Sequence, residues 1–311
     1  MRLFNRLASE CGFVKPLAVL FEYPTIRALA AEIDRNTVSH APPGHEILAT
    51  LRKTGSGTPL FLVHGGDGGV MFYRPLADKL VGLDAPVYAI ESPSLNHRDR
   101  AVPEMGSLVT EYLNLIRSKQ PRGPYRVAGY SFGGIVGFEI ASRLHAMGES
   151  VKLVIFDTDN PAVSVSRQHG VWRRMDVAWK RFNSERLIPR IGKIAQRFAA
   201  RRANERLLRE KLRRLNTAWN NGVLTDLEDR ALYLNELFQK MLASYVPRGR
   251  VPDALLIKSS ADVEGADLPS DYGWGSLIGT LHSTTVPASH FTLFEPPAID
   301  VMVPALEQYL R

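Results

Sequence analysis

From about residue 47 onward, short apolar runs alternate with segments whose apolar residues recur at helical spacing. Continuous apolar runs are typical of strands buried on both faces, and a period near 3.6 indicates helices. The runs predict strands at Leu60–Val63, Val87–Ile90, Tyr125–Ala128, Val151–Phe156, Ala254–Lys258 and Thr284–Val286. The helical spacing predicts helices at Phe72–Leu80, Met105–Ser118, Phe132–Met147, within 167–245, and at Ile299–Leu310. This alternation predicts an α/β fold, with a mostly parallel sheet covered by helices.

One long segment interrupts the alternation. Roughly residues 161–250 separate two predicted strands that a short crossover helix would normally join. The segment has helical patterns and contains Trp172, Trp179 and Trp219, which an exposed linker would not carry. It therefore predicts a helical insertion above the sheet.

The N-terminal part has a separate pattern. Residues 24–35, PTIRALAAEIDR, have a proline near the start and apolar Ile26, Leu29 and Ile33 at helical spacing, which predicts a short amphipathic helix. The polar, proline-containing stretch that follows predicts a linker at residues 36–46. We therefore expect three parts: residues 1–35, the linker, and a main domain over 47–311.

The clearest chemical motif is a G-x-S-x-G sequence between a predicted strand and a predicted helix. It places Gly129 and Gly133 around Ser131. A sharp strand-to-helix turn of this kind requires small neighbours and presents the serine at the carboxyl edge of the sheet. We expect Ser131 to be a catalytic nucleophile.

A serine nucleophile needs a base and an acid that orients the base. Among the histidines, only His290 follows the last predicted strand in a loop before the terminal helix, whereas His282 precedes that strand. His290 is the predicted base. Asp157 ends one predicted strand and Asp262 follows the next, and the order serine, acid, histidine leaves both open as the acid.

Acyl transfer also needs donors for the oxyanion of the tetrahedral intermediate. The glycine-rich turn LFLVHGGDGG follows the first predicted strand. We expect the backbone amides of Gly66, in this turn, and Phe132, after the nucleophile, to form the oxyanion hole. His64, which precedes the glycines, is expected to hold the turn in shape.

The amino-acid composition excludes several classes of protein. The chain has 311 residues, is 45% hydrophobic, and has one cysteine, Cys11, so an internal disulfide and a cysteine-rich metal site are excluded. No apolar run is long enough for a membrane span or a signal peptide. We expect a cytoplasmic enzyme that binds neither metal nor membrane.

The net charge of +7 is concentrated in one place. Between Arg167 and Arg214 there are 16 Lys and Arg against 4 Asp and Glu, inside the predicted insertion. No nucleic-acid-binding motif accompanies these charges, so we do not expect a nucleic-acid partner.

Four segments, in this order and spacing, resemble the type I thioesterase domains that end nonribosomal peptide and polyketide synthases. They read PLFLVHGGDGG, YRVAGYSFGG, LVIFDTDNP and VPASHFTLFEPP, and the likeness covers 47–311 apart from the insertion. The resemblance implies the α/β-hydrolase fold, a helical lid formed by the insertion, and Asp157 as the acid, with Asp262 as the alternative. It also implies acyl or peptidyl release through a Ser131 acyl-enzyme, by hydrolysis or cyclisation.

The N-terminal piece, including LFEYPTIRALA, resembles the last third of a phosphopantetheine carrier domain, without the serine that holds the pantetheine arm. The resemblance implies a substrate delivered by an upstream carrier and no cofactor bound by this chain. Because carriers of this family are typically acidic, the positive charge of Arg167–Arg214 leads us to expect that the basic lid helps to dock the carrier. The alternatives are a free-standing serine esterase or lipase, and a carrier-docking module whose catalysis has decayed. Acyl-chain identity and oligomeric state stay open.

Overall fold

The computed structural model describes residues 2–36 except 14, 16 and 18, and residues 47–96, 101–165, 193–260 and 269–311. Three sequence expectations fall outside these residues: Asp262, residues 37–46 of the linker, and residues 166–192 of the insertion.

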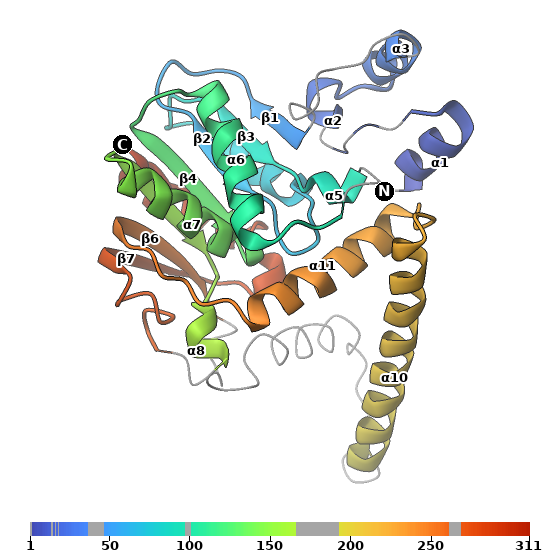
Figure 1. Cartoon of the computed structure of the whole chain (residues 1–311). Coiled ribbons are helices and arrows are strands. Elements are labelled where there is room, and N and C mark those ends of the chain that lie inside the picture. Colours follow the sequence, from blue (N-terminus) through green and yellow to red (C-terminus); the bar gives the residue numbers. More distant parts are fainter. Residues whose placement is uncertain are drawn as a thin grey trace.

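A seven-stranded sheet forms the centre of the described chain, in the order β1-β3-β2-β4-β5-β6-β7 (Figure 1). Only β1 and β3 pair antiparallel; the other neighbours are parallel. The strands are β1 (Leu48–Arg52), β2 (Leu60–Val63), β3 (Val87–Ile90), β4 (Tyr125–Tyr130), β5 (Val151–Phe156), β6 (Val251–Ser259) and β7 (Ile278–Val286). The predicted α/β class with a mostly parallel sheet is confirmed.

Both edge strands differ from the sequence expectation. β1 was not predicted, and β7 begins at Ile278 rather than Thr284, so that His282 lies inside this strand and not before it. Edge strands pair on one side only and do not need the continuous apolar run of a central strand. Most side chains of β7 are exposed or half-buried, which explains why its first half was missed.

Helices cover both faces of the sheet, and two apolar clusters fill the space between. Alternate residues of β2 enter different clusters: Phe61 and Val63 join one, and Leu60 and Leu62 join the other. The first cluster includes α6 (Met105–Lys119) and α7 (Phe132–Ala146), and the second includes α4 (Arg74–Lys79) and α12 (Ala298–Leu310). Shorter elements are η2 (Met71–Tyr73), α5 (Pro93–Asn96) and η3 (His290–Thr292).

The described part of the insertion is helical, as the sequence predicts. It contains α8 (Pro161–Val165), α10 (Lys193–Asn220) and α11 (Leu227–Ala243). Figure 1 shows α10 extending away from the sheet and α11 returning toward it. Leu234 and Phe238 of α11 are fully buried in the first apolar cluster, so α11 is part of the core.

The N-terminal segment contains α1 (Arg2–Cys11), α2 (Val19–Glu22) and α3 (Ile26–Asn36), which share a small apolar cluster. Leu227 at the start of α11 packs against this cluster. The predicted apolar stripe of α3 is only partly buried, because Leu29 is buried while Ile26 is 91% exposed. No helix among the described residues combines the length and apolarity that a membrane crossing requires.

Candidate active site

Ser131 occupies the turn between β4 and α7. Its backbone has φ 55° and ψ −120°, a conformation that side-chain-bearing residues seldom adopt. A Cβ at Gly129 would lie 1.9 Å from the carbonyl oxygen of Gly133, and one at Gly133 would lie 2.3 Å from that of His64. Both flanking glycines are therefore required for the chain to turn this sharply.

His290 and Asp157, which the sequence predicts as base and acid, are hydrogen bonded. His290 Nδ1 donates to Asp157 Oδ2 at 2.8 Å, and the carboxylate side chain is fully buried. Because Nδ1 carries this bond, Nε2 is the ring nitrogen through which His290 can exchange a proton with a substrate or nucleophile.

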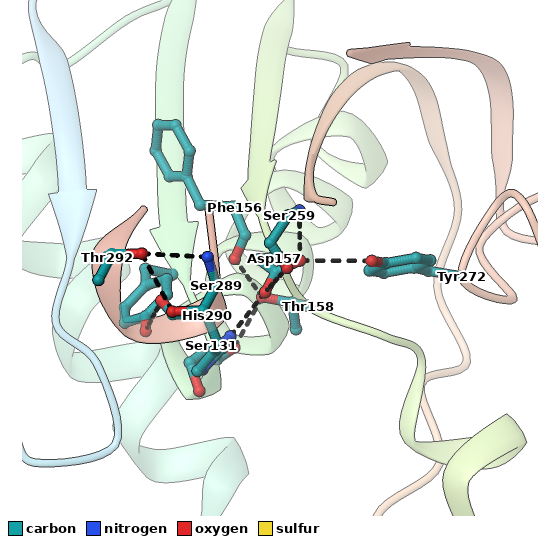
Figure 2. A network of polar contacts seen from close by, with 10 residues as sticks. Ser131, Phe156, Asp157, Thr158, Ser259, Tyr272, Ser289, His290 and Thr292 are labelled. Atoms are coloured by element: carbon teal, nitrogen blue, oxygen red, sulfur yellow. Dashed lines mark hydrogen bonds and ion pairs between the residues drawn. The ribbon is translucent and has the colours of Figure 1, made fainter. Parts of the chain in front are cut away.

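Two residues that the sequence reasoning missed also donate to Asp157. Ser259, at the end of β6, donates from its amide to Oδ1 at 2.9 Å and from Oγ to Oδ2 at 3.0 Å. Tyr272 Oη lies 3.4 Å from Oδ1. The carboxylate is thus oriented from several directions (Figure 2). The signal available in the sequence was Ser259, directly after the strand predicted at Ala254–Lys258.

Tyr130, immediately before the predicted nucleophile, holds the His290 loop. Its hydroxyl donates to the His290 carbonyl oxygen at 2.6 Å, and its ring stacks on the imidazole with centroids 4.7 Å apart. On the other side, Ser289 and Thr292 exchange capping hydrogen bonds across η3. The imidazole is therefore fixed by its carboxylate, by a stacked ring and by its own backbone.

The turns that carry Ser131 and Asp157 are bonded to each other. The Ser131 amide donates to the Phe156 carbonyl at 3.2 Å, and Thr158 Oγ1 donates to the Ser131 carbonyl at 3.0 Å. Figure 2 shows Ser131, Asp157 and His290 within one network of polar contacts. Among the described residues, the non-glycine residues with positive φ are Ser131, Asp157 and Tyr272, so the strained backbone gathers here.

Gly66 and Phe132, the predicted oxyanion donors, lie on adjoining turns. Gly66 follows β2, and Phe132 begins α7, where backbone amides have no partner within the helix. His64 Nδ1 donates to the Gly65 carbonyl at 2.6 Å, and Tyr112 Oη donates to His64 Nε2 at 2.8 Å. Burial lowers the pKa of His64 to about 4, so the ring is neutral and suited to holding the turn.

In the described part of the chain, no three His, Cys, Asp or Glu side chains are grouped as metal ligands. A serine on a sharp turn, near an imidazole oriented by a carboxylate, is an arrangement that can support acyl transfer.

Two curated relatives illustrate where similar sequences occur. CymA of Salinispora arenicola, named as a nonribosomal peptide synthetase, is 29% identical over 317 residues, covering 100% of this chain and 4% of CymA. Aspulvinone E synthetase melA of Aspergillus terreus is 36% identical over 139 residues, which is 45% of this chain and 14% of melA. This chain therefore spans a small fraction of the length of these relatives.

Solved structures share the fold of this chain. Holo-AB3403, a four-domain nonribosomal peptide synthetase, matches with a TM-score of 0.64 and 26% identity, covering 99% of this chain and 23% of its own. The thioesterase domain of NocB matches in fold with a TM-score of 0.58 and 24% identity, covering 85% of this chain and 100% of its own. A model of the family described as Thioesterase domain matches residues 58–303, most of the chain. This chain belongs to the thioesterase domain family.

Proposed function

We propose that this chain releases an acyl or peptidyl group from a phosphopantetheine carrier through a covalent Ser131 acyl-enzyme. The observation that carries this proposal is the hydrogen bond between His290 and the buried Asp157, in one polar network with a strained Ser131. This combination supports activation of a serine hydroxyl for attack on a carbonyl.

In the first half-reaction, Ser131 Oγ attacks the thioester carbonyl carbon while His290 Nε2 takes the hydroxyl proton. The amides of Gly66 and Phe132 donate to the resulting oxyanion. The intermediate collapses as the carbon–sulfur bond breaks, and the imidazolium returns its proton to the leaving thiolate. Asp157 keeps the imidazole oriented and stabilises its protonated form.

In the second half-reaction, His290 removes a proton from an attacking nucleophile, which adds to the acyl carbonyl. The bond between the acyl carbon and Ser131 Oγ then breaks, and the imidazolium returns its proton to Ser131 Oγ. Water as the nucleophile gives a free acid; a hydroxyl or amine of the bound chain gives a ring. Neither step requires a cofactor held by this chain.

We further propose that residues 1–35 are the C-terminal part of a carrier domain, followed by the linker at 36–46 and the thioesterase domain at 47–311. The similarity to CymA and to AB3403 extends over nearly the whole chain, whereas the family model begins at residue 58. An upstream carrier would then deliver the thioester, docking beside the basic part of the lid.

Mass spectrometry of the intact chain with a panel of acyl-pantetheine thioesters tests the function. We expect an acyl adduct on Ser131, lost in Ser131→Ala without loss of fold, and the released product distinguishes hydrolysis from cyclisation. An adduct that persists on another residue in Ser131→Ala contradicts the nucleophile. If the chain turns over simple oxygen esters rapidly and does not react with thioesters, a free-standing esterase is indicated instead.

A further inference from the structure

Helix α11 of the lid contacts both proposed oxyanion donors. The ring of Phe238 stacks on Phe132 with centroids 4.1 Å apart and planes 16° apart. About one turn earlier on the same helix, Asn235 lies against Gly66.

The contact at Gly66 is close. A Cβ built on Gly66 would lie 2.3 Å from Asn235 Oδ1 and 3.4 Å from its Cγ, and within 4 Å it would meet no other atom of the described chain beyond the adjoining residues. The φ of Gly66 lies outside the left-handed range, so its backbone conformation is open to alanine. A methyl group at residue 66 would therefore press on the Asn235 side chain, the one group of the described chain that it would meet beyond the adjoining residues.

A buried arginine fixes α11 in this position. Arg230 is 2% exposed and donates to the carbonyls of Leu95 at 2.7 Å, Leu224 at 3.0 Å and Ser94. Its guanidinium lies 4.9 Å from the ring centroid of Trp219. Ser94 and Leu95 belong to α5, which follows β3. These bonds attach the lid helix to the sheet domain less than two turns before Asn235.

We propose that Asn235 is a positioning residue for the oxyanion hole: it holds the turn at Gly66 so that the Gly66 amide faces the thioester carbonyl. The inference rests on the proposed function, in which Gly66 is an oxyanion donor. A donor must lie within a few tenths of an ångström of its best position, and misplacement by about 1 Å costs on the order of 100-fold in rate. The lid is thus one wall of the oxyanion hole as well as a cover for the substrate.

The test is a double-mutant cycle in the full chain, with a small acyl-pantetheine thioester that needs no carrier docking. Asn235→Ala should lower kcat about tenfold and leave KM nearly unchanged, because it loosens the turn without removing the amide. Gly66→Ala should lower kcat about 100-fold, since its methyl group pushes against Asn235. In Gly66→Ala with Asn235→Ala, the clash is relieved, and kcat should return to the level of Asn235→Ala alone.

If the two residues act independently, the double variant falls about 1000-fold, the product of the single losses, and the inference is overturned. A wild-type kcat in Asn235→Ala overturns it too. Lys240→Ala is the matched control on the same helix, because Lys240 is exposed and pairs with Glu236; it should keep wild-type kcat. Thermal unfolding confirms that each variant is folded. If Gly66→Ala does not fold, Arg230→Met replaces it: a drop in kcat without a rise in KM is expected, and unchanged kcat contradicts the inference.

The Ser131 adduct separates this inference from the proposed function. If the wild-type chain forms no acyl adduct, the proposed function itself is contradicted. Adduct formation in every variant, with a slower rate only where the turn is loosened, supports the role of Asn235.

Discussion

At the scale of single residues, the carboxylate that orients His290 is held by hydrogen-bond donors at the end of the neighbouring strand. Asp157 directly follows β5, and Ser259 ends the adjacent parallel strand β6, so the two meet at one edge of the sheet. The serine supplies two hydrogen bonds to the carboxylate, and Tyr272 approaches the same group. The geometry therefore favours Asp157 as the partner of His290.

We expect Asp157→Asn to lower kcat by on the order of 10⁴, because an amide does not stabilise the imidazolium and favours the wrong tautomer. Steady-state turnover of an acyl-pantetheine thioester measures the effect. Asp262→Asn is the comparison and should remain near wild type; a large loss there, with Asp157→Asn active, would move the acid to Asp262.

His64 predicts a pH dependence of stability. Because its pKa falls to about 4 on burial, the unfolded chain binds more protons between pH 6.5 and 4, so the free energy of unfolding falls as the pH falls through this window. The contribution of His64 to the pH dependence of the free energy of unfolding is fully present above about pH 6.5 and amounts to roughly 3 kcal/mol.

Urea unfolding at pH 7, 5.5 and 4.5 measures this effect. The loss of stability between pH 7 and 4.5 should be smaller in His64→Gln, which cannot be protonated. Tyr112→Phe keeps the imidazole buried and should keep the wild-type slope. Equal slopes in His64→Gln and wild type would show that His64 does not titrate in this way.

At the scale of elements, α11 links the N-terminal segment to the active-site turn. Asp226 caps α11 by accepting from the Asp229 amide at 2.9 Å, and Asn5 of α1 donates to the same carboxylate at 2.6 Å. Asn5 Oδ1 also accepts from the Leu227 amide at 3.0 Å. One helix end therefore holds α1 against the lid, while the middle of the helix packs on Phe132 and Gly66.

Asp226→Ala should lower the free energy of unfolding by about 1 kcal/mol, because the cap is lost. Hydrogen exchange should quicken in the first turn of α11 and in α1. Asp226→Asn keeps one oxygen for the Asp229 amide but sets an N–H group against Asn5 Nδ2, so it should lose less stability than Asp226→Ala. Equal losses in both variants would mean that the carboxylate and its bond to Asn5, not the cap, supply the stability.

At the scale of the whole molecule, positive charge lies on the projecting lid helix. Arg206, Arg209 and Arg213 of α10 are exposed, while Lys211 and Arg214 pair with Asp229 and Glu210. Most such charges do little individually, yet a field of one sign raises the rate of encounter with an acidic partner, and salt screens it. If the proposed carrier is acidic, we expect it to dock near α10.

Reversing Arg206, Arg209 and Arg213 to Glu should lower kcat/KM several-fold for an acyl group presented on a separate carrier protein. The same group on a small pantetheine analogue should be unaffected. Rising salt should slow only the carrier-borne substrate. Reversing Arg117, Lys119 and Arg122, exposed residues before β4, is the matched control. Equal salt sensitivity for both substrates would leave α10 as an ordinary solvated surface.

The sequence by itself determined the class of the fold and the order of its central elements. Buried parallel strands require continuous apolar runs, which are visible in one dimension, and the turn around Ser131 requires glycines at both sides. The edge strand β1 and the early part of β7 were not predicted because edge strands need no continuous apolar run. Helix α1 was also not predicted, although its apolar Leu3, Phe4 and Leu7 recur at helical spacing.

Only the tertiary structure decided which side chains meet. Asp157 stood beside Asp262 as an open alternative on residues alone, and the sequence did not indicate that Ser259, Tyr272 and Tyr130 would orient the acid and the imidazole. Nor did it indicate that Asn235, 169 positions after Gly66, fills the space above that glycine. Such contacts join residues far apart in the chain, and their distances are set by how strands align and helices pack, which local periodicity does not encode.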